Sequence, residues 1–245
     1  MQLPLPVSLP VNETFNSFVE GANGEAVSML QHISGSVSAS PVDNEPLNLS
    51  TLSIPLVLLR GGTATGKSHL LFSVCHRLAF AEIAHLYLNF DDANQWRPSV
   101  LDGLECLPVI CLDNIDQVAG RPEWEEALFD LFNKVIEKGK TIVVCSQRIA
   151  DHPVAFGLPD LASRLSWGVT YQLKPLNDEG REQALRLRAN QKGLSLSEQA
   201  LQFLLHHSDR EITSLLSLLD RLDSRSLQEQ KKLSVAMVKR ELNLP

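Results

Sequence analysis

The chain has 245 residues, enough for one large α/β domain with or without a small helical one, because domains commonly run to about 100 to 200 residues. Hydrophobic residues make up 44% and charged residues 21%, with 13 Gly and 13 Pro, which excludes collagen-like, coiled-coil and mostly disordered chains. Lys and Arg number 22 against 29 Asp and Glu, so the net charge of −7 gives no sign of nonspecific nucleic-acid binding. We therefore expect proteins or small ligands as partners.

Cysteine usage and hydropathy bear on the compartment. The chain has four cysteines and no C-x-x-C pair: Cys75, Cys106, Cys111 and Cys145. The last two lie inside apolar runs, where a thiol behaves as a small hydrophobic group. The longest strongly apolar run, residues 54–59, is far shorter than the roughly 20 residues of a membrane helix, and no basic segment leads into an apolar one at the start. We expect a protein of a reducing compartment, the cytoplasm.

The region before the first strand is read in three parts. Residues 1–11 are rich in proline and carry no charged side chain, which predicts an extended tail outside the core. Residues 26–33 predict a short helix. Residues 34–53 are rich in Ser, Pro and Asn, which predicts a surface loop before the first strand.

From residue 54 onward, short apolar runs alternate with helical segments. The predicted strands cover residues 54–59, 84–90, 107–113, 141–146 and 169–173, and the predicted helices between them cover residues 68–80 and 123–138. Runs such as VICL and IVVC are apolar on both faces, as a parallel sheet with helices on either side requires. The expected fold class is therefore α/β, a three-layer αβα domain with a parallel sheet of the nucleotide-binding kind.

The pattern changes after Pro175, where no further strand is predicted. Four helical segments follow, residues 177–191, 197–206, 209–224 and 234–242, with leucines at the helical spacing that indicates core packing. The chain thus divides into an extended tail at residues 1–11, an α/β domain at residues 12–174 and a small helical domain at residues 175–245.

Residues 61–68, GGTATGKS, match the phosphate-loop pattern G-x-x-x-x-G-K-[ST], after a predicted strand and at the start of a predicted helix. The glycines let consecutive backbone N–H groups point at phosphate oxygens, and Lys67 neutralises the β and γ charges. The predicted nucleotide-binding residues are Gly61, Gly62, Thr63, Ala64, Thr65, Gly66, Lys67, Ser68 and the adjoining His69. The alternative is a glycine-rich turn that binds nothing.

A magnesium ion is expected with the nucleotide. The Ser68 hydroxyl would complete its oxygen shell. Asp113 ends an apolar strand expected to neighbour the phosphate-loop strand, and would hold the water ligands of the ion. The alternative for Asp113 is a carboxylate that only ends a strand or caps a turn. Ser146, at the end of another strand, could sense the γ-phosphate, although serine is common at strand ends.

Asn114 stands where many P-loop ATPases carry the carboxylate that orients and deprotonates the attacking water. An amide cannot take up this proton, so the isolated chain is predicted to hydrolyse nucleotide slowly or not at all. Asp116 could substitute, but two residues further along it should leave the strand and point elsewhere.

Four segments resemble the AAA+ initiator family and, within it, the Hda-type regulators: residues 14–19 (TFNSFV), 112–116 (LDNID), 157–165 (GLPDLASRL) and 208–211 (SDRE). They span most of the chain, and the last two are the more specific, because Walker-type motifs occur across a very large superfamily. The resemblance implies an AAA+ domain, a helical lid domain and bound ADP or ATP, with adenine inferred from the family alone. Two features depart from the family: Asn114 replaces an acid, and the loop at residues 34–53 has no obvious counterpart.

The resemblance makes Arg164, which precedes Trp167 and Gly168, an arginine finger that reaches the nucleotide of a neighbouring subunit. A planar, permanently charged guanidinium can stabilise the charge that develops in phosphoryl transfer, an effect of about 10³ to 10⁵ in rate. The alternative is a structural arginine paired with Asp160 or Asp151 in a loop.

By the same resemblance, Arg210 is the sensor arginine of the lid, and the S-x-x-E spacing of residues 208–211 predicts a helix start there. Phe15, Phe18 and Val19 would form part of the pocket for the base. The alternatives are a solvated arginine at a helix start and plain core packing for the three apolar residues.

The N-terminal tail resembles the short peptide that binds the DNA polymerase sliding clamp. In that peptide a glutamine anchors by hydrogen bonds and apolar side chains fill a pocket, while prolines reduce the ordering entropy lost on docking. The matching residues are Gln2, Leu3, Leu5 and Pro6. Initiators continue into a helix-turn-helix domain that has no counterpart before residue 245, so we expect no sequence-specific DNA binding. The shortness of the apolar runs leads us to expect no membrane association either.

The expected function is negative regulation of DNA replication initiation. The nucleotide-bound chain would dock on the clamp and present Arg164 to the ATP of the DnaA initiator, so that hydrolysis occurs in the partner. Two alternatives remain: an autonomous P-loop enzyme, such as a helicase-loader-type ATPase or a small-molecule kinase, and an adaptor in which nucleotide only stabilises the fold. The sequence allows a homodimer or larger oligomer, and it fixes neither the oligomeric state nor the base.

Overall fold

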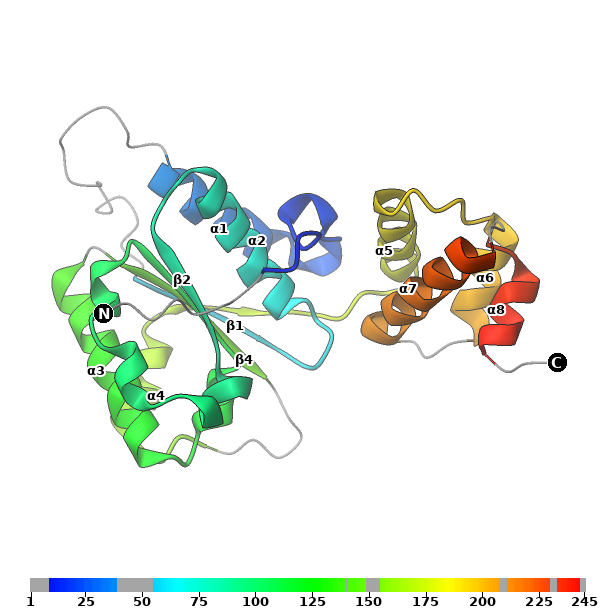
Figure 1. The fold of residues 1–245 in the computed structure, drawn as a ribbon. Helices are drawn as coiled ribbons and strands as arrows, with labels where there is room; N and C mark the ends of the chain where they lie inside the picture. Colours follow the sequence, from blue (N-terminus) through cyan, green and yellow to red (C-terminus); the bar gives the residue numbers. More distant parts are fainter. Residues whose placement is uncertain are drawn as a thin grey trace. The chain divides into compact units, whose positions relative to one another are not determined.

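The computed structural model describes residues 9–38, 55–139, 141–148, 155–207, 211–229 and 233–242 (Figure 1). The predicted clamp-binding residues 2–6 and the predicted sensor segment 208–210 lie outside the described residues, as do residues 39–53 of the predicted loop.

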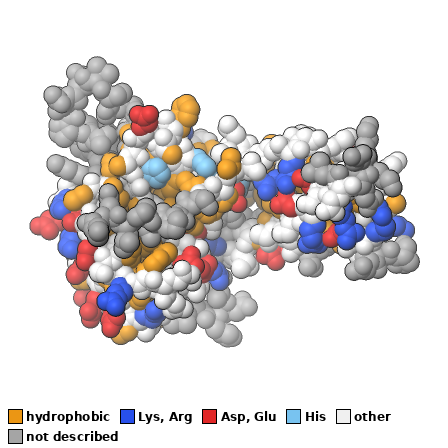
Figure 2. All heavy atoms as spheres, in the orientation of Figure 1, with side chains coloured by type: hydrophobic (Ala, Val, Ile, Leu, Met, Phe, Trp, Pro, Cys, Tyr) orange, Lys and Arg blue, Asp and Glu red, His pale blue; other side chains and the backbone are white. Residues whose placement is uncertain are grey.

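The chain forms two compact units. The first contains Met1–Phe15 and Asn23–Lys174, and the second contains Asn16–Ala22 and Pro175–Pro245. The sequence pattern places Asn16–Ala22 in the α/β domain, whereas the structure groups these residues with the helical unit. On the face shown in Figure 2, both units carry acidic and basic side chains.

A five-stranded sheet forms the middle of the first unit, with the strand order β2-β3-β4-β1-β5 and all pairs parallel. The strands are β1 (Leu56–Gly61), β2 (His85–Asn89), β3 (Val109–Asp113), β4 (Ile142–Arg148) and β5 (Val169–Gln172). Each overlaps a predicted strand, although β1 and β4 end two residues later than predicted, so the α/β prediction with a parallel sheet is confirmed. One detail is wrong. Because β4 pairs with both β1 and β3, the strand that ends at Asp113 is not the direct neighbour of the phosphate-loop strand.

Helices cover both faces of the sheet (Figure 1). The four longer helices of this unit are α1 (Gly24–Ser38), α2 (Lys67–Phe80), α3 (Pro122–Lys138) and α4 (Pro159–Ser166). Helix α2 packs on the strands with α1 beside it, and α3 packs with α4 on the opposite face. The three-layer arrangement predicted from the sequence is therefore present.

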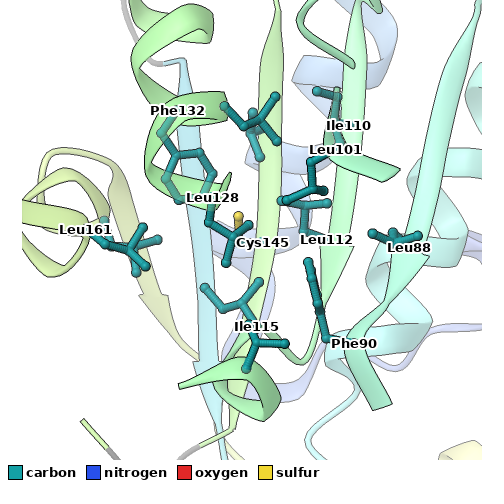
Figure 3. Packing of buried hydrophobic residues seen from close by; sticks show 14 of the residues in the cluster. Leu88, Phe90, Leu101, Ile110, Leu112, Ile115, Leu128, Phe132, Cys145 and Leu161 are labelled. Atoms are coloured by element: carbon teal, nitrogen blue, oxygen red, sulfur yellow. The ribbon is translucent and has the colours of Figure 1, made fainter. Parts of the chain in front are cut away.

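The core beneath α3 and α4 is built by the alternation of side chains along each strand. Leu112 of β3 and Cys145 of β4 point to this face, where they meet Leu128 and Phe132 of α3 and Leu161 of α4 (Figure 3). All five side chains are at most 2% exposed. The strands are buried on both faces, which explains why their sequences are continuously apolar.

Helix α1 continues to Ser38, past the end predicted at residue 33 and into the predicted loop. Ser34 is fully buried, and its hydroxyl donates to the carbonyl oxygen of Leu30 at 2.8 Å. A serine that returns its hydroxyl to the preceding turn can lie inside a helix, so polar composition was a misleading guide at this point.

Several short helices were missed because they are too brief to show a periodic pattern. They are the 3₁₀ helices η1 (Phe15–Ser17), η2 (Gly21–Asn23), η4 (Phe90–Gln95), η5 (Pro98–Leu101), η6 (Leu104–Cys106) and η7 (Ile115–Val118). Helix α4 was missed for the same reason, although its first residue, Pro159, suits the first position of a helix.

The second unit contains the four helices predicted after Pro175. They are α5 (Asp178–Gln191), α6 (Glu198–His207), α7 (Ile212–Glu229) and α8 (Val235–Glu241). Leucines at the predicted spacing, among them Leu201, Leu204 and Leu219, are fully buried in one apolar cluster. None of the described helices has both the length and the apolar character that a bilayer-spanning segment requires.

Candidate functional site

The predicted phosphate loop connects the end of β1 to the start of α2. Gly66 (φ 87°) and Ala64 (φ 56°) have left-handed backbone conformations, which bend the chain sharply. The Thr65 hydroxyl donates to the carbonyl oxygen of Gly62 at 3.0 Å and closes the turn. A Cβ at Gly61 would lie 2.6 Å from Thr65 Oγ1, so a larger residue there would displace the loop.

Lys67 lies folded over this loop and is only 6% exposed. Its Nζ donates to the carbonyl oxygens of Gly61 at 3.0 Å and Gly62 at 2.6 Å. Burial lowers the pKa of Lys67; the Asp113 carboxylate opposes this shift and the Arg148 guanidinium adds to it. A phosphate group beside this ammonium would replace neutral partners by an anion and stabilise its charge. The loop is thus suited to bind phosphate.

The remaining predicted loop residues differ in their surroundings. Thr63 is exposed, and Ser68 is half-buried in the first turn of α2. His69 Nε2 lies 3.0 Å from the carbonyl oxygen of Thr14, and His76, two turns further along α2, lies 2.9 Å from a second carbonyl oxygen of the same segment. The imidazole ring of His69, which the sequence assigns to nucleotide binding, thus contacts the N-terminal segment in this structure.

Asp113 is fully buried at the end of β3, and both of its carboxylate oxygens have partners. Tyr87 donates its hydroxyl to Oδ2 at 2.7 Å, and Ser146 donates to Oδ1. Burial and the neighbouring Asp113 carboxylate raise the pKa of Tyr87 well above its usual range, so the phenol remains a donor. Ser146, predicted to sense phosphate, is itself fully buried. These donors fix the carboxylate and leave each oxygen a second lone pair.

The oxygen donors of Ser68 and Asp113 fit the chemistry of magnesium, which is usually held by one or two carboxylates together with phosphates and water. Among the residues that the structure describes, no group of three or more His, Cys, Asp or Glu side chains could hold a metal ion. This donor set suits an ion that arrives with the phosphates of a nucleotide.

Asn114 follows Asp113 with a left-handed backbone (φ 56°) and donates three hydrogen bonds. Its N–H donates to Ser146 Oγ at 2.8 Å. Its side-chain Nδ2 donates to Asn89 Oδ1 and to Asp91 Oδ2, both at 3.0 Å. The side chain is thus fixed as a donor, and it offers no basic atom to an attacking water.

Arg148, Asn89 and Asp91 belong to this network and were not predicted from the sequence. Arg148 ends β4 in register with Gly61, and its Nη2 lies 3.3 Å from Asp91 Oδ1. Its backbone N–H donates to Asp116 Oδ1 at 2.7 Å, which places Asp116 at the end of β4. The available signal was that each of these polar residues lies within two residues of the end of a predicted strand, where the carboxyl ends of parallel strands meet at one edge.

Arg164 lies on α4 and is half-buried. Its Cζ is 4.3 Å from the ring centroid of Trp167 and 6.0 Å from that of Phe129 on α3. Trp167 is 65% exposed, which is unusual for so large an apolar side chain. Among the described residues Arg164 has no ion pair, so the alternative pairing with Asp160 is not formed, and Asp151 lies outside the described residues.

The residues predicted to form part of the base pocket belong to both units. Phe15 is half-buried in the first unit, whereas Phe18 and Val19 are half-buried in the second. The predicted sensor Arg210 lies outside the described residues.

Solved structures of initiators and motor proteins share this fold. Domain III of Thermotoga maritima DnaA superposes with a TM-score of 0.77 and is 20% identical, over 97% of this chain and 98% of that one. AMPPCP-bound DnaA from Aquifex aeolicus gives 0.64 at 18% identity, over 91% of this chain and 71% of that one. The Thermotoga maritima RuvB branch migration motor gives 0.62 at 14% identity, over 94% and 73%. At these identities the likeness shows the fold.

Two family models match successive parts of the sequence, and the boundary between them falls next to Pro175, where the main part of the second unit begins. The bacterial DnaA ATPase domain matches residues 9–172, and the Hda lid domain matches residues 178–242. Since the first match alone covers more than half of the chain, this protein belongs to the family of the bacterial DnaA ATPase domain and is an Hda-type, DnaA-like AAA+ protein.

Proposed function

We propose that this DnaA-related regulator of replication initiation binds an adenine nucleotide and stimulates ATP hydrolysis by the DnaA initiator in trans. The observation that carries the proposal is Arg164, a half-buried arginine that lies against an exposed tryptophan and has no acidic partner among the described residues. Such a guanidinium is available to phosphate oxygens of another molecule.

The chain's own nucleotide would occupy residues 61–68. A left-handed glycine, a buried ammonium and the first turn of α2 meet in this loop, which is how a helix N-terminus receives phosphate. The structure of Aquifex aeolicus DnaA contains AMPPCP, which supports adenine as the base in this chain. Ser68 and Asp113 would hold a magnesium ion, whose positive charge would offset that of the β- and γ-phosphates.

The site is poorly equipped to hydrolyse that nucleotide. Asn114 occupies the position after Asp113, and its amide hydrogens point to Asn89 and Asp91. Asn114 therefore supplies no proton acceptor at the position where P-loop ATPases activate water. We infer weak or no intrinsic hydrolysis, so the bound nucleotide would act as a structural cofactor that stabilises the folded chain.

Arg164 would act instead on the partner's nucleotide. A guanidinium supplied by a neighbouring molecule stabilises the charge that spreads over the transferred phosphoryl group, an effect of about 10³ to 10⁵ in rate. Trp167, exposed beside Arg164, would be covered when the two molecules meet, and a large aromatic side chain with an arginine is typical of the centre of an interface.

Binding to the sliding clamp through Gln2, Leu3, Leu5 and Pro6 remains a proposal that rests on the sequence of the tail alone. In this scheme the regulator docks on a DNA-loaded clamp, and hydrolysis in DnaA then lowers the supply of ATP-bound initiator. A cytoplasmic location, and a homodimer or larger oligomer, stay predictions of the same kind.

The test is ATP hydrolysis by purified, ATP-loaded DnaA with this protein and clamp-loaded DNA present. Arg164→Ala should reduce the stimulated rate by at least about 10³-fold and leave nucleotide binding to this chain intact. Arg97→Ala, which changes an exposed arginine of the same unit, is the matched control. Full stimulation by Arg164→Ala would refute the proposal. Brisk hydrolysis by this chain alone would favour the autonomous ATPase of the helicase-loader type.

A further inference from the structure

Glu125 is a buried acid on a helix face that is otherwise apolar. It lies on α3 beside Trp124 and one turn before Leu128, and it is only 2% exposed. Burying a carboxylate in such surroundings is strongly unfavourable unless hydrogen bonds replace those to water. The hydrogen-bond partners of Glu125 therefore indicate its role.

Three backbone N–H groups from two loops donate to this carboxylate. Glu125 Oε1 accepts from Gly120 at 2.6 Å and from Gly157 at 3.0 Å, and Oε2 accepts from Leu158 at 2.6 Å. Burial acts to raise the pKa of Glu125, but the hydrogen bonds from Gly157, Leu158 and Gly120 outweigh it and lower the pKa overall. The carboxylate thus remains charged, and charge-assisted hydrogen bonds are the stronger kind.

Two of these bonds lie at the start of α4. Leu158 is the N-cap of α4, and its carbonyl oxygen accepts the N–H of Leu161 at 3.1 Å, within the helix. Leu158 and Gly157 direct their own N–H groups to Glu125, because these groups have no partner inside the helix. The carboxylate therefore fixes the point from which α4 begins, and Arg164 lies less than two turns further along the same helix.

Apolar contacts also join α4 to α3, in addition to the approach of Arg164 to the ring of Phe129. Leu161 and Leu165 are 0% and 5% exposed, and they pack in one cluster with Leu128 and Phe132. Apolar contacts hold two helices together but are not directional, whereas hydrogen bonds at 2.6 to 3.0 Å define one position along the axis.

We propose that Glu125 is the positioning residue of Arg164: it fixes the N-terminus of α4 so that the guanidinium meets the partner's phosphates. This inference rests on the proposed function of Arg164 and adds to it a residue that does not touch the partner. A displacement of about 1 Å at a reacting centre can lower a rate by roughly 100-fold, so a loosened α4 should lower catalysis more than binding.

The test compares Glu125→Gln with Glu126→Gln in the full-length protein. Glu126 is the next residue of α3 and is exposed, so Glu126→Gln removes the same charge but breaks none of the buried hydrogen bonds of Glu125. The glutamine amide at position 125 turns an acceptor into a donor that faces another N–H. Amide hydrogen exchange at Gly157 and Leu158 should accelerate at least about tenfold in Glu125→Gln, since local protection follows these bonds.

Stimulated DnaA hydrolysis should fall about 10- to 100-fold in Glu125→Gln at saturating regulator, with the half-saturating concentration nearly unchanged. Nucleotide binding by this chain should stay intact, which a general loss of structure would not allow. Glu126→Gln should behave as the wild-type protein in all three measurements. Unchanged exchange at residues 157 and 158, or lost protection with full stimulation, would overturn the inference.

Glu125→Asp covers the case in which the glutamine variant does not fold. Aspartate keeps the charge with a side chain one methylene shorter, and stimulation should then follow the protection of Gly157 and Leu158, whether both are kept or both are lowered. If the aspartate variant loses stimulation but keeps the protection, or keeps stimulation but loses the protection, the inference is overturned. Arg164→Ala is measured in parallel. If Arg164→Ala stimulates fully, the proposed function itself fails. If Arg164→Ala loses stimulation while the Glu125 variants keep it, only the role of Glu125 fails.

Discussion

Lys67 and Arg164 are the two cations on which the proposed function depends, and the α/β unit holds them in opposite ways. Lys67 is 6% exposed and donates to two carbonyl oxygens of its own loop. Arg164 is half-buried, its guanidinium carbon lies 4.3 Å from the ring centroid of Trp167, and Trp167 is 65% exposed. One cation is enclosed by the chain that carries it, and the other is presented at a surface.

The surroundings extend this difference. The phosphate loop adjoins a network in which Asp113, Asn114 and Ser146 bind one another across the ends of β3 and β4. Arg164 has around it an aromatic face and a helix fixed at its start by Glu125. A site that binds a ligand for structure can be completed within one chain. A site that acts on another molecule's ligand has to remain incomplete until that molecule arrives.

After the loss of stimulated DnaA hydrolysis in Arg164→Ala, the largest effect expected is on nucleotide binding by this chain. Lys67→Ala removes a buried ammonium whose bonds to phosphate would contribute about 1.5 to 3 kcal/mol, so nucleotide affinity should fall roughly 10- to 150-fold. Fluorescent ADP titration measures it, with the exposed Lys134→Ala as control. Arg164→Ala should leave this affinity unchanged, and a loss there as well would show that the two regions do not work separately.

A smaller effect is expected at the surface, where Trp167 is changed. The stacking of Arg164 on an exposed ring contributes about 0.5 to 1 kcal/mol, so Trp167→Ala should lower stimulated DnaA hydrolysis roughly two- to fivefold through orientation alone. Trp167→Phe keeps an aromatic face and should retain most of the activity. The hydrolysis assay used for Arg164→Ala measures both variants.

Phe80→Ala is the matched control for this substitution, because Phe80 is also an exposed aromatic side chain, at 92%, but lies on α2. A loss far above fivefold in Trp167→Ala would mean that the ring itself is buried against the partner. No loss at all would mean that Glu125 and the packing of α4 suffice to place Arg164.

The two regions also differ in how far the sequence predicts them. The phosphate loop is contiguous, and a strand before it and a helix after it are local patterns, so its position could be read directly. The order of the strands could not be predicted, because a local pattern does not show which strands pair. In the structure β4 lies between β1 and β3. Tyr87, the donor to Asp113, was missed for the same reason.

Glu125 was missed because its partners are backbone N–H groups, which no residue type marks. Two of them, at Gly157 and Leu158, are more than 30 residues away in sequence. One signal was available: the apolar face of α3 runs through Trp124, Leu128 and Phe132, and Glu125 lies one turn from Leu128 on that face. An acidic residue at a core position of a predicted helix indicates a buried carboxylate that accepts hydrogen bonds from groups elsewhere in the fold.

Nucleotide binding should also depend on pH, through the enclosed cation Lys67. Burial lowers the pKa of Lys67, and a bound phosphate would raise it again, so the free protein loses this proton at lower pH than the complex. Below the pKa of the free protein both states are charged and affinity is constant. Above it, affinity should fall by up to about tenfold per pH unit until the pKa of the complex is reached. Nucleotide binding should therefore take up protons at alkaline pH.

Calorimetry in two buffers of different ionisation enthalpy detects this proton uptake, and ADP titrations across the alkaline range give the slope. Lys67→Arg is the control, because a guanidinium stays charged throughout and should give a flat profile. If wild type and Lys67→Arg show the same slope, the titrating group lies elsewhere, and Lys67 is less enclosed in solution than its two carbonyl contacts indicate. In that case Lys67 and Arg164 would differ in their position in the fold, but not in how far water reaches them.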